Sequence, residues 1–396
     1  MKAIRIRIGL VGVTCAAAAV VMAATARAQG APADSTTLLD LAAARARDVA
    51  TQIESAKPAP RGRARPDPGL TVYLQGVAYL AKRQFDSAVV PLQAAATVGG
   101  DNARYHGDLA YTLASLGRLE EAATQYLAAV RLQSANPWYY VGVGVVRANQ
   151  ERWQEAAANF TLAYATDSSI IDPRLVAAAS LATEKSGDEQ GLFQWSERST
   201  AKFPDYPAPW LRLASLLRTP GRTDTARGLA AIRHYRSLKA TDRLGDAVYA
   251  LYLFDAGQHD SAVDLAIEAS KDTALRRYAA PVLLRVGATW LSQKQYDSAS
   301  WALSAGLAVT PPNLHDRFLF YLSFANLQRL VPMYTAAVPK RDCAAGHVVD
   351  SLLTQADSGF HATVAVDSAQ TTHIINDILP NIHTRVAEFV EQCKRH

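Results

Sequence analysis

The feature that most constrains this 396-residue chain is the regular spacing between three similar phrases. Ala88, Ala122 and Ala156 are evenly spaced, and each ends a phrase that opens with a bulky apolar residue: Phe-Asp-Ser-Ala, Leu-Glu-Glu-Ala and Trp-Gln-Glu-Ala. A fixed period of about 34 residues is typical of a helix–turn–helix unit that buries its apolar face only when it stacks on copies of itself. The spacing therefore predicts an all-α fold of stacked helical hairpins.

Other positions recur in phase with these alanines. Small residues return where two helices must approach closely, and large residues return where the space between helices must be filled. The second unit shows the full set: Leu109, Ala110, Leu113, Gly117, Ala122, Tyr126 and Ala129. This pattern resembles the tetratricopeptide repeat (TPR) family. The resemblance implies a right-handed TPR-type solenoid, with three clear repeats over residues 69–170.

The repeat pattern weakens after residue 170. The period continues with drifting residues, so we expect degenerate TPR-like repeats over 171–312, with the insertions in the turns. Over 313–396 the period is lost, and apolar spacing predicts a divergent C-terminal helical cap, in which Pro332 and Pro339 break the chain. The predicted solenoid thus fills residues 69–312 and ends in a cap.

Residues 1–28 have the order of a secretory signal peptide. Three basic residues precede an apolar run over 8–24, which is followed by Ala26-Arg27-Ala28. We expect cleavage after these residues and a periplasmic or secreted protein; a retained N-terminal anchor is the alternative. Because the signal holds four basic residues and no acidic ones, its removal lowers the net charge from +5 to +1. The basic pI is then no argument for nucleic-acid binding.

Two segments separate the signal from the repeats. Residues 29–56 have apolar side chains at helical spacing and predict one amphipathic helix. Residues 57–68 contain four prolines and four basic residues and predict an extended linker. The linker is either a solvated spacer or a tether that contacts anionic lipid or an acidic partner surface.

The sequence offers no pattern of catalytic chemistry. Ser199 to Lys202 matches S-x-x-K, but neither S-D-N nor K-T-G follows. Six of the nine histidines lie beyond residue 313, without the spacing of four that places two imidazoles on one helix face. We expect no catalytic residue, metal, cofactor or small-molecule substrate. Cys343 and Cys393 either form a disulfide that ties the last helix to the body, or are two buried thiols.

The family resemblance also implies where a partner binds. The first helix of each TPR unit lines a groove, and many of the positions expected to face it hold aromatic or cationic side chains, which are common in binding hot spots. Some family members clamp a peptide carboxylate with paired Lys, Arg and Asn residues. The first two units lack these residues, and their absence favours an extended or helical partner segment. The expected contact residues are Tyr73, Arg104, Tyr111, Trp138, Asn149, Arg174, Lys185, Arg218 and Phe254.

Together these patterns predict an exported, non-enzymatic scaffold. We expect an accessory subunit of a membrane-associated complex at the cell envelope, which binds membrane-associated protein partners and no nucleic acid, with peripheral contact to the membrane through its basic segments. Two alternatives stay open. One is an envelope enzyme with an unrecognised site in the cap, and the other is a structural protein that self-associates through a helix over residues 34–56.

Overall fold

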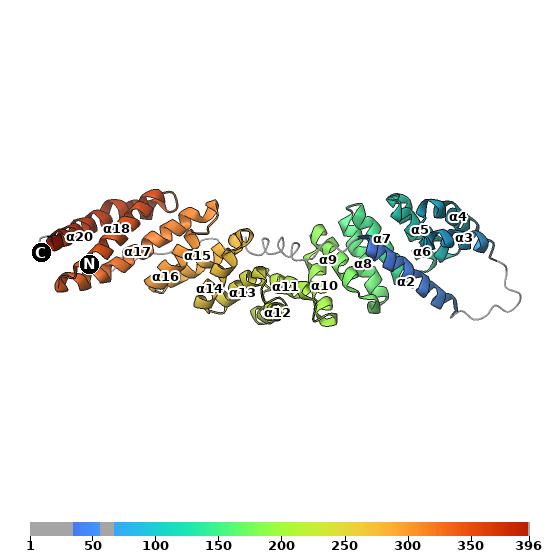
Figure 1. Ribbon diagram of the computed structural model, residues 1–396, viewed down its shortest axis with the longest axis horizontal. Coiled ribbons are helices and arrows are strands. Elements are labelled where there is room, and N and C mark those ends of the chain that lie inside the picture. Colours follow the sequence, from blue (N-terminus) through green and yellow to red (C-terminus); the bar gives the residue numbers. More distant parts are fainter. Residues whose placement is uncertain (1–34, 56–66, 395–396) are drawn as a thin grey trace. The chain divides into compact units, whose positions relative to one another are not determined.

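The computed structural model describes residues 35–55 and 67–394, which form helices and no strand (Figure 1). The predicted signal peptide and most of the predicted linker lie outside these residues. The chain divides into two bodies at Pro209 and Trp210, and each is described by itself.

The first body contains helical hairpins, each packed on the next. Three of them occupy the region of clear repeats, and the fourth begins the region expected to be degenerate. A short 3₁₀ turn, η1 (Ser168–Ile170), precedes the fourth hairpin. The hairpins are α3 (Leu70–Ala81) with α4 (Phe85–Val98), α5 (Ala103–Ser115) with α6 (Leu119–Leu132), α7 (Pro137–Asn149) with α8 (Trp153–Thr166), and α9 (Pro173–Ser186) with α10 (Glu189–Lys202).

Small residues at the helix contacts explain why these hairpins form. Ala88, Ala122 and Ala156 are fully buried, so that the helices they join approach closely. Gly144 of α7 has the same role, because a Cβ atom there would lie 2.6 Å from the ring of Phe160. The period that predicted the fold is thus a period of helix contacts.

The turns within the hairpins repeat as well. Arg83, Gly117 and Glu151 are separated by the same interval as the buried alanines, and their φ angles are all positive, at 54°, 76° and 58°, respectively. Only glycine adopts this left-handed conformation without a steric cost, which is of order 1 kcal/mol for other residues. The turn therefore keeps its geometry even where the sequence does not supply glycine.

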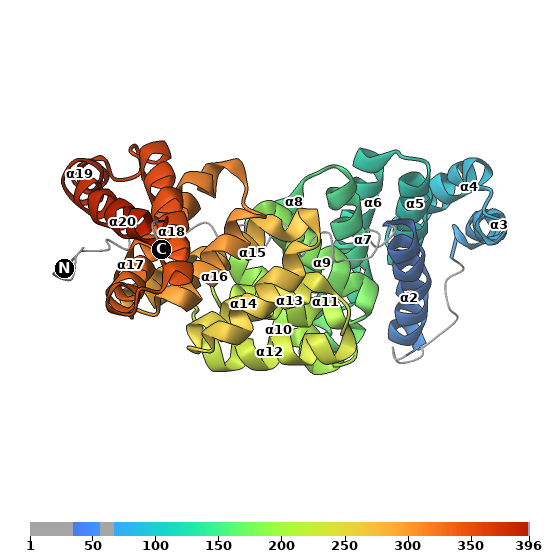
Figure 2. The ribbon, with the colours of Figure 1, turned by 60° about the vertical axis from the view of Figure 1, so that its left-hand side comes forward.

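Helix α2 (Ser35–Ser55) is not part of a hairpin (Figures 1 and 2). It precedes α3 in the chain but packs chiefly against α5 and α7, with a smaller contact to α9. It is the helix expected within residues 29–56, and its position against the repeats was not predicted.

The second body continues the hairpin pattern through the region of drifting residues. Helix α13 packs on α14, α14 on α15, and α15 on α16. Its helices up to residue 307 are α11 (Pro207–Leu216), which contains the boundary between the bodies, α12 (Thr225–Leu238), α13 (Arg243–Asp255), α14 (His259–Ser270), the 3₁₀ turn η2 (Thr273–Leu275), α15 (Arg276–Ser292) and α16 (Tyr296–Leu307).

The C-terminal part is helical as expected, but its first helix is longer. Helix α17 (Pro312–Lys340) runs through Pro332, so the predicted break there is wrong. A proline inside a helix costs about 3 kcal/mol, and the packing of α17 against α16 and α18 (Cys343–Ala362) outweighs that cost. Pro339 is the last residue but one of α17, where the helix ends in any case.

The chain ends with α19 (Ser368–His373), a π-helical turn (Ile374–Ile378) and α20 (Leu379–Lys394). A disulfide joins Cys343, the first residue of α18, to Cys393 in the last turn of α20, with 5.6 Å between their Cα atoms. It ties the last helix to the body, which is one of the two outcomes that the sequence left open. Across the described residues, 35–55 and 67–394, every helix falls short of the length and apolarity that crossing a bilayer requires.

Candidate functional site

The surface expected to bind a partner is covered by α2. The side of α2 that faces the repeats is built from small residues, with two leucines at its N-terminal end. Their spacing of three and four residues places them on one side of the helix, as in an amphipathic helix. These buried residues are Leu38, Leu39, Ala42, Ala43, Ala46 and Ala50. We call the side chains of the repeats that bind α2, together with Tyr73, which donates to one of them, the α2-binding face: Tyr73, Arg83, Arg104, Asp108, Tyr111 and Asn136.

Three charged residues of α2 follow one another at intervals of seven: Asp40, Arg47 and Glu54. Seven residues are close to two turns of an α-helix, so the three side chains leave the helix on nearly the same side. Each forms an ion pair with a residue of opposite charge on the repeats. The repeats therefore bind α2 through three charged residues in the order acidic, basic and acidic.

The central pair is the most buried. Arg47 Nε lies 2.7 Å from Asp108 Oδ1, and the Tyr73 hydroxyl donates to Asp108 Oδ2 at 2.7 Å. The side chain of Asp108 is only 3% exposed. Burial lowers the pKa of Arg47, but the ion pair with Asp108 more than offsets this and raises the pKa overall. Burial, together with the charge of Asp108, raises the pKa of Tyr73. Both groups keep their protons at neutral pH.

The outer pairs are more exposed. Asp40 Oδ2 accepts from Arg83 Nη1 at 3.1 Å, and Asp40 Oδ1 accepts from the Tyr111 hydroxyl at 2.6 Å. Burial, followed by this hydrogen bond, raises the pKa of Tyr111 to about 12. At the other end, Arg104 Nη2 lies 2.8 Å from Glu54 Oε2. Exposed pairs of this kind contribute about 0–1 kcal/mol, so they add selectivity more than stability.

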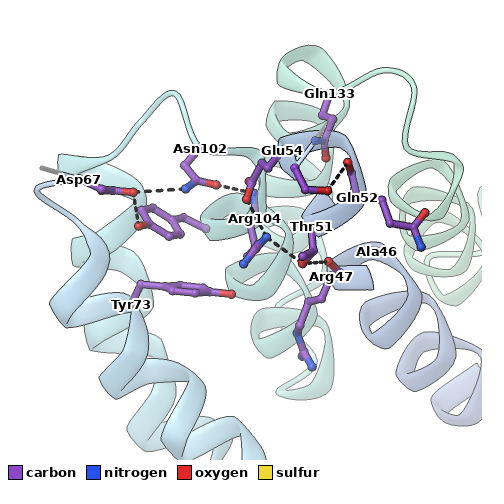
Figure 3. Close-up of polar contacts among 12 residues, drawn as sticks. Ala46, Arg47, Thr51, Gln52, Glu54, Asp67, Tyr73, Asn102, Arg104 and Gln133 are labelled. Carbon is purple, nitrogen blue, oxygen red and sulfur yellow. Dashed lines mark hydrogen bonds and ion pairs between the residues drawn. The ribbon is translucent and has the colours of Figure 1, made fainter. Parts of the chain in front are cut away.

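Hydrogen bonds fix the register of α2 between these charges. Figure 3 shows Arg104 directed toward Thr51 and Glu54, and Arg104 Nη2 donates to Thr51 Oγ1 at 3.0 Å. Asn136, which caps α7, donates from Nδ2 to the backbone carbonyl of Ala46 at 2.9 Å. This second bond brings the backbone of α2 next to the repeats, which requires a small residue at that point.

An open cleft of about 730 Å³ remains on the flank of α2. One wall belongs to α2, with Arg45, Asp48 and Gln52, and the other is formed by η1 and the start of α9. Two of the residues expected to contact a partner, Trp138 and Arg174, line it. The cleft therefore combines an aromatic ring, a cation and apolar side chains, a composition suited to a protein segment.

The remaining expected contact residues lie elsewhere. Asn149 and Lys185 are exposed near the ends of α7 and α9. Arg218 and Phe254 belong to the second body, where Arg218 forms an ion pair with Asp255 and Phe254 stacks on His259 with 5.4 Å between ring centroids. Within the first body the structure thus gathers Tyr73, Arg104, Tyr111 and Trp138 next to α2, and Arg174 next to its cleft, and does not bring Asn149 and Lys185 to that site.

Sequence reasoning missed the helix that occupies the site. The signal was present in α2 itself, as the seven-residue spacing of Asp40, Arg47 and Glu54 beside an alanine stripe. It also missed Asp108 and Arg83, because the family pattern assigns groove positions only within the first helices and gives no reason to expect a buried acid there.

Several of the groups with catalytic potential are paired or buried. Ser199 of the S-x-x-K match is fully buried and donates to the carbonyl of Trp195. In the cap, Asp357 lies between His361 and His383, at 3.0 and 3.3 Å. Among residues 35–55 and 67–394 no group of three or more His, Cys, Asp and Glu residues could hold a metal ion. A second cleft of about 820 Å³ in the second body is lined mainly by polar residues, among them His259, Asp297 and Arg329.

The architecture and the site define a class: an all-α helical-repeat protein with a surface that holds an amphipathic helix. Residues 110–151 match the TPR repeat family. This segment lies within the region of clear repeats, so the match agrees with the resemblance seen in the sequence. A comparison with curated protein sequences found no match.

The chain is also similar to several solved structures. YrrB, "a TPR protein with an unusual peptide-binding site", shares 18% identity and a TM-score of 0.39, covering 47% of this chain and 95% of YrrB. PilF of Pseudomonas aeruginosa shares 17% identity and a TM-score of 0.36, covering 51% and 90%. A tetratricopeptide repeat protein from Parabacteroides merdae shares 13% identity and a TM-score of 0.36, covering 65% and 98%.

Proposed function

We propose that this chain is a non-enzymatic scaffold that binds a segment of a protein partner at the α2-binding face and the adjoining cleft. The observation that carries the proposal is the seated helix itself. This surface holds an amphipathic α-helix by matched charges and a small-residue stripe, and it leaves Trp138 and Arg174 beside that helix in an open cleft. Helix binding by complementary side chains is an established mode of peptide recognition.

The place of action that we propose is the cell envelope, as an accessory subunit of a membrane-associated complex. Two features support export. Residues 1–28 have the order of a secretory signal, and the disulfide between Cys343 and Cys393 is of a kind that persists in oxidising compartments outside the cytosol. The basic residues of the segment between α2 and α3 favour partners or lipids with negative charge.

Site-specific photocrosslinking in cells tests the proposal. A photoreactive amino acid at position 174 faces the cleft, and the same amino acid at position 162, exposed on α8, is the matched control outside the cleft. We expect position 174 to crosslink to one protein partner and position 162 not to do so. Trp138→Phe should retain the crosslink and Trp138→Ser should weaken it. Equal products from both positions, or none from position 174, would refute the proposed site.

A further inference from the structure

We propose that the α2-binding face recognises an α-helix of the partner that carries the same side-chain pattern as α2, and that this helix takes the place of α2. The pattern is an acidic, a basic and an acidic residue seven positions apart, beside a stripe of alanines. This inference rests on the proposed function and specifies the chemistry of the partner segment.

The first argument is that α2 is bound to the repeats as a ligand would be. Hairpins α3–α4 to α9–α10 pack on one another in chain order, and the contacts within them are made by their own small residues, such as Ala122 and Gly144. Helix α2 adds no hairpin to this stack. It crosses from α5 to α7 and is held there by its buried leucines and alanines, by three ion pairs and by a hydrogen bond to one backbone carbonyl.

The second argument is that Asp108 makes the site selective. Its carboxylate is 3% exposed and accepts hydrogen bonds from Tyr73 and Arg47. An occupant without a cation at this point would remove the positive charge that compensates this buried carboxylate, which is strongly unfavourable. Arg83 and Arg104 select acidic residues on either side. The surface therefore favours one order of charges and disfavours the inverse order.

The third argument concerns shape. Asn136 reaches the backbone carbonyl of Ala46, and the neighbouring contact residues of α2 are Ala42, Ala43 and Ala50, all buried. A larger side chain at these positions would hold the helix away from the repeats and break the contact to Asn136. An occupant must therefore have small residues in its middle two turns.

The cleft explains how another helix can displace α2. Because α2 belongs to the same chain, its effective concentration at the site is on the order of millimolar. A second copy of α2 has no additional contact with which to compete. A partner helix with larger side chains on the cleft side can contact Ile171 and Arg174 as well, and this extra contact favours a partner over a second copy.

A labelled peptide measures this recognition in the full chain. The probe is a synthetic fluorescein-labelled peptide with the sequence of residues 35–55, and its fluorescence anisotropy reports binding. Arg47→Ala in the chain weakens the resident α2, whereas the peptide keeps its own arginine. We expect this variant to bind the peptide about tenfold more tightly than the unaltered chain does. Ser55→Ala is the control, because Ser55 is exposed, does not line the cleft and donates to the carbonyl of Gln52 in the same helix.

A charge reversal tests the pattern itself. In the Arg47→Ala chain that also carries Arg104→Glu, the peptide with Glu54→Arg should bind at least fivefold more tightly than the unaltered peptide, since both compete with the same resident α2. Circular dichroism of each variant verifies that the repeats remain folded. If the peptide binds equally well with Arg47→Glu, or if Arg47→Ala in the chain changes nothing, the inference is wrong.

Two further outcomes separate this inference from the proposed function. A concentration-dependent dimer of the Arg47→Ala chain in sedimentation velocity would assign the surface to a second copy and overturn the partner assignment. A partner crosslinked at position 174 together with failed peptide binding would overturn this inference alone. Absence of any crosslink at position 174 would overturn the proposed function, whatever the peptide does.

Discussion

The ion pair between Arg47 and Asp108 allows a quantitative test of how α2 is held. A hydrogen bond to a charged group contributes about 1.5–3 kcal/mol when it is buried. Asp108 is buried, but the Arg47 side chain is 35% exposed, so water screens part of the interaction and the low end applies. We expect Arg47→Ala to destabilise the docked state of α2 by about 1.5 kcal/mol, which is roughly a tenfold change in its opening equilibrium.

Hydrogen exchange measured by mass spectrometry is the suitable assay, because it reports the opening of α2 without unfolding the two bodies. In Arg47→Ala, amides of residues 35–55 should exchange about tenfold faster, whereas those of α6 and α8 should be unchanged. Asp108→Asn keeps the acceptor for Tyr73 and removes the charge. The double variant completes a cycle whose coupling energy should be about 1–2 kcal/mol.

The matched control is Arg83→Ala. Arg83 also forms an ion pair with α2, but its side chain is 60% exposed, so its removal should change exchange by a factor of about two or less. The reasoning would be refuted by an unchanged rate for α2 in Arg47→Ala, by a coupling energy near zero, or by equal effects of Arg47→Ala and Arg83→Ala.

Three further predictions follow from features outside this pair. Ala122→Leu should overpack the contact between α5 and α6 and lower the free energy of unfolding by about 1–3 kcal/mol. Thr124→Leu, on the exposed side of α6, should change the free energy of unfolding by less than about 0.5 kcal/mol. Similar urea midpoints for the two variants would contradict this. The cysteines of the disulfide are 50 residues apart, so its reduction should lower the stability of docked α20 by about 4 kcal/mol in the chain-entropy account. Amides of residues 379–394 should then exchange faster in dithiothreitol. Unchanged exchange would argue against this. The pKa of Tyr111 is raised to about 12 from an ordinary value of about 10, so its stabilising contribution is complete below pH 10 and is lost as the pH rises through 12. The difference in absorbance at 295 nm between the unaltered chain and Tyr111→Phe should therefore titrate near pH 12. A midpoint near pH 10 would show that the hydroxyl is free.

The fold was accessible from the sequence because its determinants are local and periodic. Ala88, Ala122 and Ala156 mark contacts between helices that are neighbours in the chain, and a period of such contacts is visible without knowledge of the structure. The same argument accounts for the failure at Pro332. Its helix is maintained by packing against α16 and α18, and such tertiary support cannot be read from the local sequence.

The candidate site was accessible only in part, for a related reason. The family pattern led us to expect Tyr73, Arg104 and Tyr111 in a groove, and all three contact α2 directly or through Asp108. The occupant could not be predicted, because the ion pairs that seat it join residues 50 and 61 positions apart. Nothing in a single sequence indicates which distant residue of opposite charge an exposed acid or base will contact.

The charges of α2 have a symmetry that bears on the direction of a bound helix. Acidic, basic, acidic reads the same from either end, so Arg83, Asp108 and Arg104 could pair equally well with a helix that runs the opposite way. Direction must then be decided by side-chain volume, since the leucines lie at the N-terminal end of α2 and alanines fill the rest of its buried side. A partner helix with its bulky residues at the C-terminal end would satisfy the same three charges while lying antiparallel to α2.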